Sequence, residues 1–107
     1  MTRFTRHFRN GASTLIIRWT ELALEDFDEA MLYIKRDNPN AAVSVAQRIW
    51  DASNQLAVYP GAGKPGRIPG TRELVISGPP FILPYRVMQD RVEILRVLHS
   101  SRKWPTT

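Results

Sequence analysis

One histidine and several basic side chains are the residues in this sequence best suited to chemistry. His99 has an imidazole that titrates near neutral pH, so it is suited to moving protons. Cations that could gather around it come from the second half of the chain: Lys64, Arg67, Arg72, Arg86 and Arg102. Together they would form a metal-free ribonuclease site, in which the cations stabilise a pentacovalent phosphorane while His99 transfers a proton.

The same residues also fit a purely structural interpretation. A lone histidine often makes only a structural hydrogen bond, and each cation is consistent with a solvated loop charge or a salt bridge across a sheet. Trp104 follows Arg102 and Lys103 in a basic tail, where it could stack on a base, anchor a protein contact or pack back on the domain. What supports a functional role is that these cations share the basic half of the chain.

Several other chemistries are excluded by composition and spacing. The chain has no cysteine, so it has no disulfide, thiolate nucleophile or cysteine-ligated metal. His7 and His99 stand in unrelated places and form no metal cluster, and residues 61–66 are glycine-rich but lack the spacing of a phosphate-binding loop. Ser100 and Ser101 beside His99 do not make a catalytic triad. We therefore expect neither a metal nor a cofactor.

Length and charge suggest one small domain with a basic surface. The 107 residues fit a single domain, and the net charge is +5. Residues 1–18 carry +4, residues 19–59 carry −4 and residues 60–107 carry +5, so an acidic middle lies between basic ends. This pattern favours acidic or phosphate-rich partners, although a charge excess that merely improves solubility explains it equally well.

The longest apolar run argues against a membrane protein. Leu15, Ile16 and Ile17 are far fewer than the roughly 20 apolar residues needed to span a bilayer. We expect a protein that is neither secreted nor membrane-embedded, with a cytoplasmic location.

The first half of the chain predicts a basic arm, a strand and two helices. Residues 1–14 show no sustained apolar period and are interpreted as a flexible basic arm, which leaves residues 15–107 as the domain. A short strand is expected at 15–19, and Thr20 is a plausible N-cap for an amphipathic helix ending near Asp37. Asn38 and Pro39 then start a second helix, so the two helices should form an antiparallel hairpin.

The second half predicts a loop followed by three strands. Residues 59–70 hold three prolines and four glycines, which indicates a loop. Strands are expected at 72–77, 80–88 and 91–99 because these runs are rich in β-branched and aromatic residues. The fold class is therefore α+β, a helical hairpin packed on a small, mainly antiparallel sheet in the order β-α-α-β-β-β.

A two-residue hairpin loop at residues 89–90 would fix the register of the last two strands. Arg86 would then face Glu93, an opposite-charge pair across the ladder. One face would be the core face, carrying Phe81, Leu83, Tyr85, Val87, Val92, Ile94 and Leu98. Arg96 also falls on that face, so either it snorkels at a sheet edge or a bulge shifts the register.

Several motifs occur together over residues 15–105 and carry a resemblance to a known family. They are Trp19-Thr20, Ala23-Leu24, Tyr33-Ile34, Asn38-Pro39-Asn40-Ala41-Ala42, Leu56, Tyr59-Pro60, the run from Gly66 to Val75, Tyr85-Arg86-Val87, and the run from Val92 to His99. In combination they resemble RelE/ParE toxins of type II toxin-antitoxin systems. The resemblance implies a growth-arresting toxin that forms a hetero-oligomer with a cognate antitoxin.

The resemblance leaves two targets open. RelE-like members cleave messenger RNA on the ribosome with basic residues and a tyrosine or histidine near the chain end, whereas ParE-like members inhibit DNA gyrase without a known catalytic site. The ending Leu98-His99-Ser100 looks more like the ParE branch, and no tyrosine follows Tyr85. We therefore favour gyrase inhibition. In the nuclease alternative His99, Arg86, Arg72 and Arg67 would be catalytic.

Target-binding residues are expected in the basic half of the chain under either hypothesis: Lys64, Arg67, Arg102, Lys103 and Trp104. A third hypothesis from a different class is a non-toxic nucleic-acid-binding module. It predicts salt-dependent binding of DNA or RNA and no growth arrest on expression.

Overall fold

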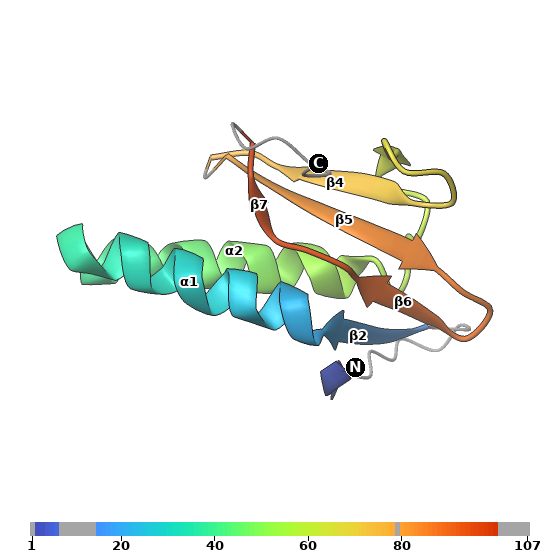
Figure 1. Cartoon of the computed structure of the whole chain (residues 1–107), viewed down its shortest axis with the longest axis horizontal. Coiled ribbons are helices and arrows are strands. Elements are labelled where there is room, and N and C mark those ends of the chain that lie inside the picture. Colours follow the sequence, from blue (N-terminus) through green and yellow to red (C-terminus); the bar gives the residue numbers. More distant parts are fainter. Residues whose placement is uncertain (1, 7–14, 79, 101–107) are drawn as a thin grey trace.

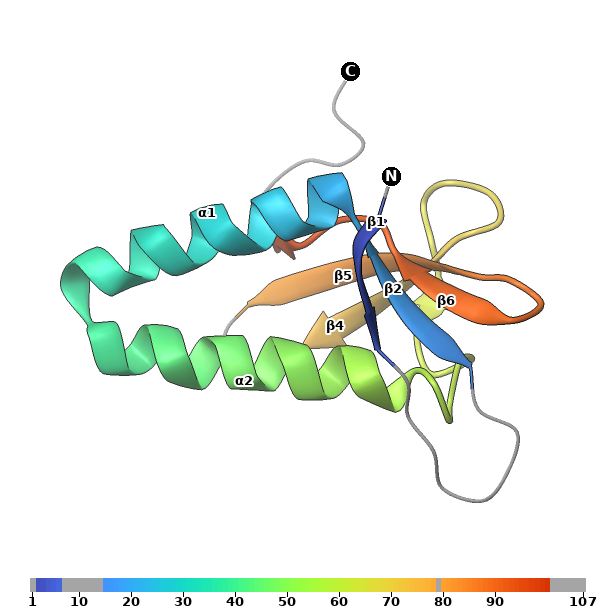
Figure 2. The same ribbon diagram turned by 90° about the horizontal axis from the view of Figure 1, so that it is seen from below.

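Two long helices pack across one face of a mixed β-sheet (Figures 1 and 2). This computed structural model describes residues 2–6, 15–78 and 80–100 of the chain. The helices are α1 (Glu21–Asp37) and α2 (Pro39–Gln55), joined by the single residue Asn38. The predicted helical hairpin is therefore confirmed.

The predicted α+β fold and its order are confirmed as well, with short strands added. In the described residues the strands are β1 (Thr2–Arg6), β2 (Ile16–Thr20), β3 (Lys64–Pro65), β4 (Arg72–Ile76), β5 (Phe81–Val87), β6 (Arg91–Ile94) and β7 (Leu98–His99). Their order across the sheet is β1-β2-β6-β5-β4-β3, and β7 also pairs with β5. Only β2 and β6 run parallel among these pairs, so the sheet is mainly antiparallel.

Side-chain caps fix where both helices begin. The Thr20 hydroxyl accepts the Ala23 N–H at 3.1 Å, and the Asn38 side chain accepts the Ala41 N–H at 3.1 Å. Each cap satisfies an N–H that has no partner within its helix. Pro39 follows Asn38 at the first helical position, where its missing N–H costs nothing. Both helix starts agree with the sequence prediction.

An aromatic cluster joins the helices to the sheet. The Trp19 ring on β2 lies 4.9 Å from the Trp50 ring on α2 and 5.8 Å from the Phe27 ring on α1, measured between centroids. Trp19 is fully buried. The predicted core face also holds except at two positions. Val87 is 41% exposed near the end of the hairpin, and Leu98 pairs with Ile82 on the opposite face of β5, because the register shifts by one residue between β6 and β7.

The last predicted strand, residues 91–99, is divided in two, and a proline explains the division. The predicted hairpin register is confirmed: Arg86 faces Glu93 and Tyr85 faces Ile94. The Leu95 N–H still donates to the Pro84 carbonyl at 2.8 Å, but proline has no N–H to donate in return. The Leu95 carbonyl instead accepts the Thr20 hydroxyl at 3.0 Å, and the chain leaves the ladder until β7.

Arg96 lies in this break and does not enter the core. Its guanidinium pairs with Asp26 of α1, Nε to Oδ2 at 2.6 Å and Nη2 to Oδ1 at 3.1 Å. The Val97 N–H donates to the same Oδ2 at 3.0 Å. A continuous strand would have placed Arg96 on the core face. Because the strand is interrupted there, Arg96 pairs with Asp26 instead.

The basic arm needs a correction at its beginning. Residues 2–6, interpreted as part of a flexible arm, form β1, which pairs antiparallel with the edge of β2. Threonine and phenylalanine in Thr2-Arg3-Phe4-Thr5 favour extended backbone, which explains the strand. Residues 7–14 lie outside the described part of the chain, and the division at residue 14 stays a prediction.

Candidate functional site

The sheet face opposite the helices carries an arginine cluster around one carboxylate. Glu93 accepts Arg86 Nη2 at 2.6 Å and Arg91 Nε at 3.0 Å. Arg18 lies beside Glu93 in the β2–β6 register. The hydrogen bond from Arg86 is the main cause that lowers the pKa of Glu93, opposed by its burial and reinforced by Arg91. Arg86 is therefore already held within the fold by an internal anion.

A second carboxylate holds the predicted loop. Glu73 on β4 is 2% exposed, and its Oε2 accepts the Arg67 backbone N–H at 3.0 Å and lies 3.3 Å from Arg67 Nε. A buried carboxylate is costly unless it is paired and hydrogen-bonded. Glu73 thus fixes both the backbone and the guanidinium of Arg67. No role was predicted for Glu73 from the sequence, although it lies within the motif from Gly66 to Val75, which indicated that the residue could matter.

Two more side chains bind the same loop from the core side. Tyr85 donates its hydroxyl to the Pro60 carbonyl at 2.7 Å and accepts the Gly63 N–H at 2.8 Å. Arg72 Nη1 donates to the Gly63 carbonyl at 2.6 Å. Burial is the largest cause of a raised pKa for Tyr85, so the phenol stays protonated. Arg72, a predicted catalytic cation, is engaged with the backbone here.

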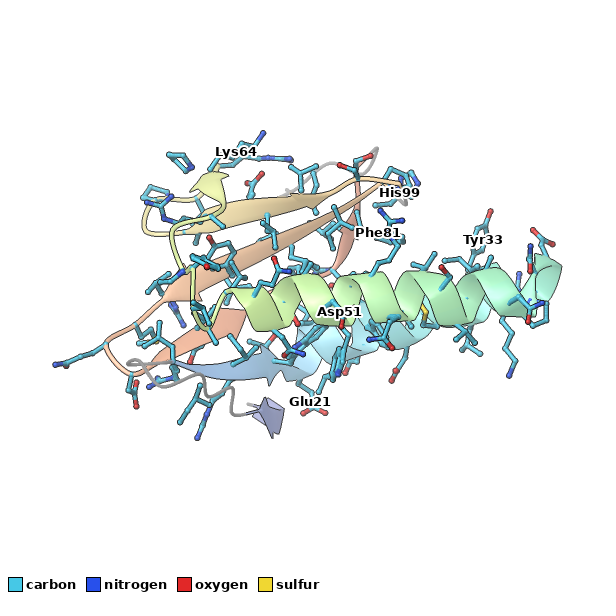
Figure 3. All side chains as sticks on the ribbon, turned by 180° about the vertical axis from the view of Figure 1, so that it is seen from behind. Glu21, Tyr33, Asp51, Lys64, Phe81 and His99 are labelled. Atoms are coloured by element: carbon cyan, nitrogen blue, oxygen red, sulfur yellow. The ribbon has the colours of Figure 1, made fainter. Side chains whose placement is uncertain are left out.

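His99 lies at the opposite end of the sheet from these cations. Its partner in the register is Phe81, the first residue of β5, whereas Arg86 lies five residues further along that strand. At about 3.3 Å per residue the two positions are about 16 Å apart. Figure 3 shows the same arrangement, with His99 beside Phe81 and far from Lys64. Among the described residues, the structure therefore does not bring His99 together with Lys64, Arg67, Arg72 or Arg86, and Arg102 lies outside them.

His99 instead lies at the rim of a groove between the helical hairpin and the sheet. The groove has a volume of about 840 Å³. It is lined mainly by apolar side chains, among them Tyr33, Val45, Phe81 and Val97, together with the acidic Asp26 and Glu29 and the basic Arg36. Tyr33 is 69% exposed and Leu32, which also lines the groove, is 64% exposed. Apolar surface of this kind marks a protein-binding site more often than a catalytic one.

The predicted target-binding residues fall into two groups. Lys64 and Arg67 are exposed on the loop before β4. Arg102, Lys103 and Trp104 lie outside the described residues, so their roles stay predictions.

Within residues 2–6, 15–78 and 80–100, no group of three or more His, Cys, Asp or Glu side chains could hold a metal ion. No helix there is long and apolar enough to cross a bilayer.

The known proteins that this sequence resembles are toxins. The family described as ParE toxin of type II toxin-antitoxin system, parDE, matches residues 17–104. A putative toxin, Y4kP, of Sinorhizobium fredii is 52% identical over 89 residues, covering 83% of this chain and 92% of the relative. Toxin RelE2 of Caulobacter vibrioides is 37% identical over 84 residues, covering 78% of this chain and 93% of the relative.

A solved structure has the same fold. A chain of the chromosomal ParDE TA system from P. aeruginosa superposes with a TM-score of 0.75 at 28% identity. The match covers 82% of this chain and 98% of that chain.

Proposed function

The chain belongs to the ParE toxin family of type II toxin-antitoxin systems, and from this premise we propose that it arrests bacterial growth by binding and inhibiting DNA gyrase. The action proposed is binding to the target rather than cleavage of a substrate. The predicted cytoplasmic location suits this target.

The observation that carries the proposal is the separation of His99 from the basic residues. A general acid or base must come within hydrogen-bond reach of the atom it serves, and cations must surround the same phosphate. Here Phe81, which faces His99, lies about 16 Å from Arg86 along β5. Arg86 and Arg67 each form a salt bridge with a carboxylate of the fold. This geometry favours a binding surface over a nuclease site.

Ribosome-dependent cleavage of messenger RNA is the second candidate function. What favours it is the 37% identity to a relative named toxin RelE2. In that case His99, Arg86, Arg72 and Arg67 would have to converge on RNA only after the protein binds the ribosome. A non-toxic nucleic-acid-binding module ranks third, because membership of a toxin family argues against it.

A cognate antitoxin is the expected partner, since the family consists of the toxins of type II toxin-antitoxin systems. We propose that the groove between the helical hairpin and the sheet receives it. Exposed Leu32 and Tyr33 offer apolar surface there, while Glu29 offers a negative charge to a basic side chain of the partner. The complex would then be a hetero-oligomer.

Purified gyrase tests the main proposal. We expect the protein to inhibit supercoiling of relaxed plasmid in a dose-dependent way, while messenger RNA in expressing cells stays intact. Cleavage of RNA on ribosomes together with unaffected supercoiling would favour the second function. Salt-dependent DNA binding without growth arrest would favour the third.

A further inference from the structure

We infer that Tyr85 is a positioning residue that holds the loop of residues 60–71 in the shape that recognises an acidic surface of the target protein. This inference rests on the proposed function, because it assumes that the protein acts by binding. It goes beyond that function by assigning the recognition element and the residue that fixes its shape.

The hydroxyl of Tyr85 closes the first part of the loop. Its side chain is fully buried in the core of the domain, and its hydroxyl oxygen hydrogen-bonds to the loop. The oxygen donates to the Pro60 carbonyl and accepts the Gly63 N–H, so it joins two points three residues apart. Since both partners are backbone groups, the phenol fixes the path of the chain itself.

Arg72 and Glu73 hold the rest of the loop from neighbouring positions on β4. Arg72 donates to the Gly63 carbonyl, and Glu73 accepts the Arg67 N–H. Tyr85 lies directly opposite Arg72 in the register, so the three side chains act from adjacent places on β4 and β5. A loop this rich in glycine loses much conformational entropy when it is ordered, and the hydrogen bonds from these three side chains offset that cost.

Two glycines show how closely the loop fits its support. A Cβ atom at Gly63 would lie 2.7 Å from the Tyr85 hydroxyl oxygen and 2.8 Å from the Glu73 carbonyl oxygen. A Cβ atom at Gly66 would collide with Thr71, whose carbonyl accepts the Gly66 N–H at 2.8 Å. Any larger residue at Gly63 or Gly66 would therefore force this loop to change its conformation.

That shape presents two cations to solvent. Lys64 is exposed in β3, and the Arg67 side chain is 43% exposed even while it pairs with Glu73. Holding charges in place before binding raises affinity, because no further ordering is needed on contact. Positive charges held in this way complement an acidic surface, and under the proposed function that surface belongs to a protein.

The matched substitutions are Tyr85→Phe, which removes one oxygen from the core, and Tyr59→Phe, which removes the same atom from a side chain that is 66% exposed. For each variant three quantities would be measured: hydrogen exchange of the Gly63 amide, growth arrest on induction, and affinity for the cognate antitoxin. Lys64→Glu with Arg67→Glu supplies a direct test of the charges.

For Tyr85→Phe we expect exchange of the Gly63 amide at least 10-fold faster and about 10-fold weaker growth arrest, with antitoxin affinity changed less than 2-fold. Tyr59→Phe should match the parent in all three, and the double charge reversal should lose growth arrest while keeping antitoxin affinity. Unchanged Gly63 exchange, unchanged growth arrest, or an equal loss of antitoxin affinity would each overturn the inference. So would DNA binding by the isolated protein that Tyr85→Phe weakens, since it would assign the loop to nucleic acid.

Growth arrest is used because it does not assume which target is inhibited. A parent protein that arrests growth but leaves gyrase active would refute gyrase as the target, while the comparison of variants would still judge the loop. A parent that arrests no growth would overturn both proposals.

Discussion

The carboxylate of Asp26 links α1 to the segment between β6 and β7, so we predict that replacing it destabilises the fold. It accepts three hydrogen bonds, two from the Arg96 guanidinium and one from the Val97 N–H. The Asp26 side chain is 9% exposed and that of Arg96 is 20% exposed. Removing one partner of a buried pair typically costs about 3 to 5 kcal/mol, because the other charge stays behind unpaired. Partial exposure of Arg96 lets water reach it, so we expect Asp26→Ala to cost about 2 to 4 kcal/mol.

The assay is urea unfolding of the parent, Asp26→Ala, Arg96→Met and the double variant. If the pair is coupled as the distances indicate, the double variant should lose about 1 to 3 kcal/mol less than the sum of the two single losses. Because Asp26 also lines the groove, the single variants should weaken antitoxin binding. Additive losses within about 0.5 kcal/mol, or a loss below about 1 kcal/mol for Asp26→Ala, would refute this reasoning.

Three further predictions follow from single contacts. The lowered pKa of Glu93 means that its pairing stabilises the fold above the usual carboxyl pKa and that this contribution is lost as the pH falls through the folded-state value. Glu93→Gln should therefore be less stable than the parent by about 1 kcal/mol at pH 7, since Arg86 is half exposed. In thermal unfolding the gap should narrow as the pH falls below the usual carboxyl pKa, and a gap that stays constant with pH would contradict the assignment. Thr20→Val removes the cap of α1 and the donor to the Leu95 carbonyl, so chemical denaturation should show a free energy of unfolding lower by about 1 to 3 kcal/mol. A decrease under about 0.5 kcal/mol would contradict this double role of Thr20. Tyr33→Ala, at a side chain that is 69% exposed, should leave the free energy of unfolding within about 0.5 kcal/mol of the parent while calorimetry shows at least 10-fold weaker antitoxin binding, and unchanged affinity would place the antitoxin elsewhere.

Much of the fold was predictable because local signals and tertiary packing agree. Thr20 and Asn38 have the side chains that cap helices, and the hairpin at residues 89–90 fixes the pairing of Arg86 with Glu93. The division of the last strand was missed, although its cause is visible in the sequence. A proline at position 84 within a central strand deprives the opposite strand of one hydrogen bond.

The candidate site was less predictable because its residues meet only through tertiary structure. The sequence predicted that Arg86 pairs with Glu93, but not that Glu73 holds Arg67. Nor did it show that His99 lies at the far end of β5, since that depends on the strand register. Tyr85 was assigned to the core, and its hydroxyl contacts with the loop required coordinates.

The most direct test of the central claim is gyrase supercoiling in the presence of the purified parent protein and of His99→Ala. The account predicts that both inhibit supercoiling with the same potency, because His99 lies at the far end of β5 from the loop proposed to bind the target. It would be contradicted if the parent left supercoiling unaffected while cleaving messenger RNA on ribosomes and His99→Ala abolished that cleavage.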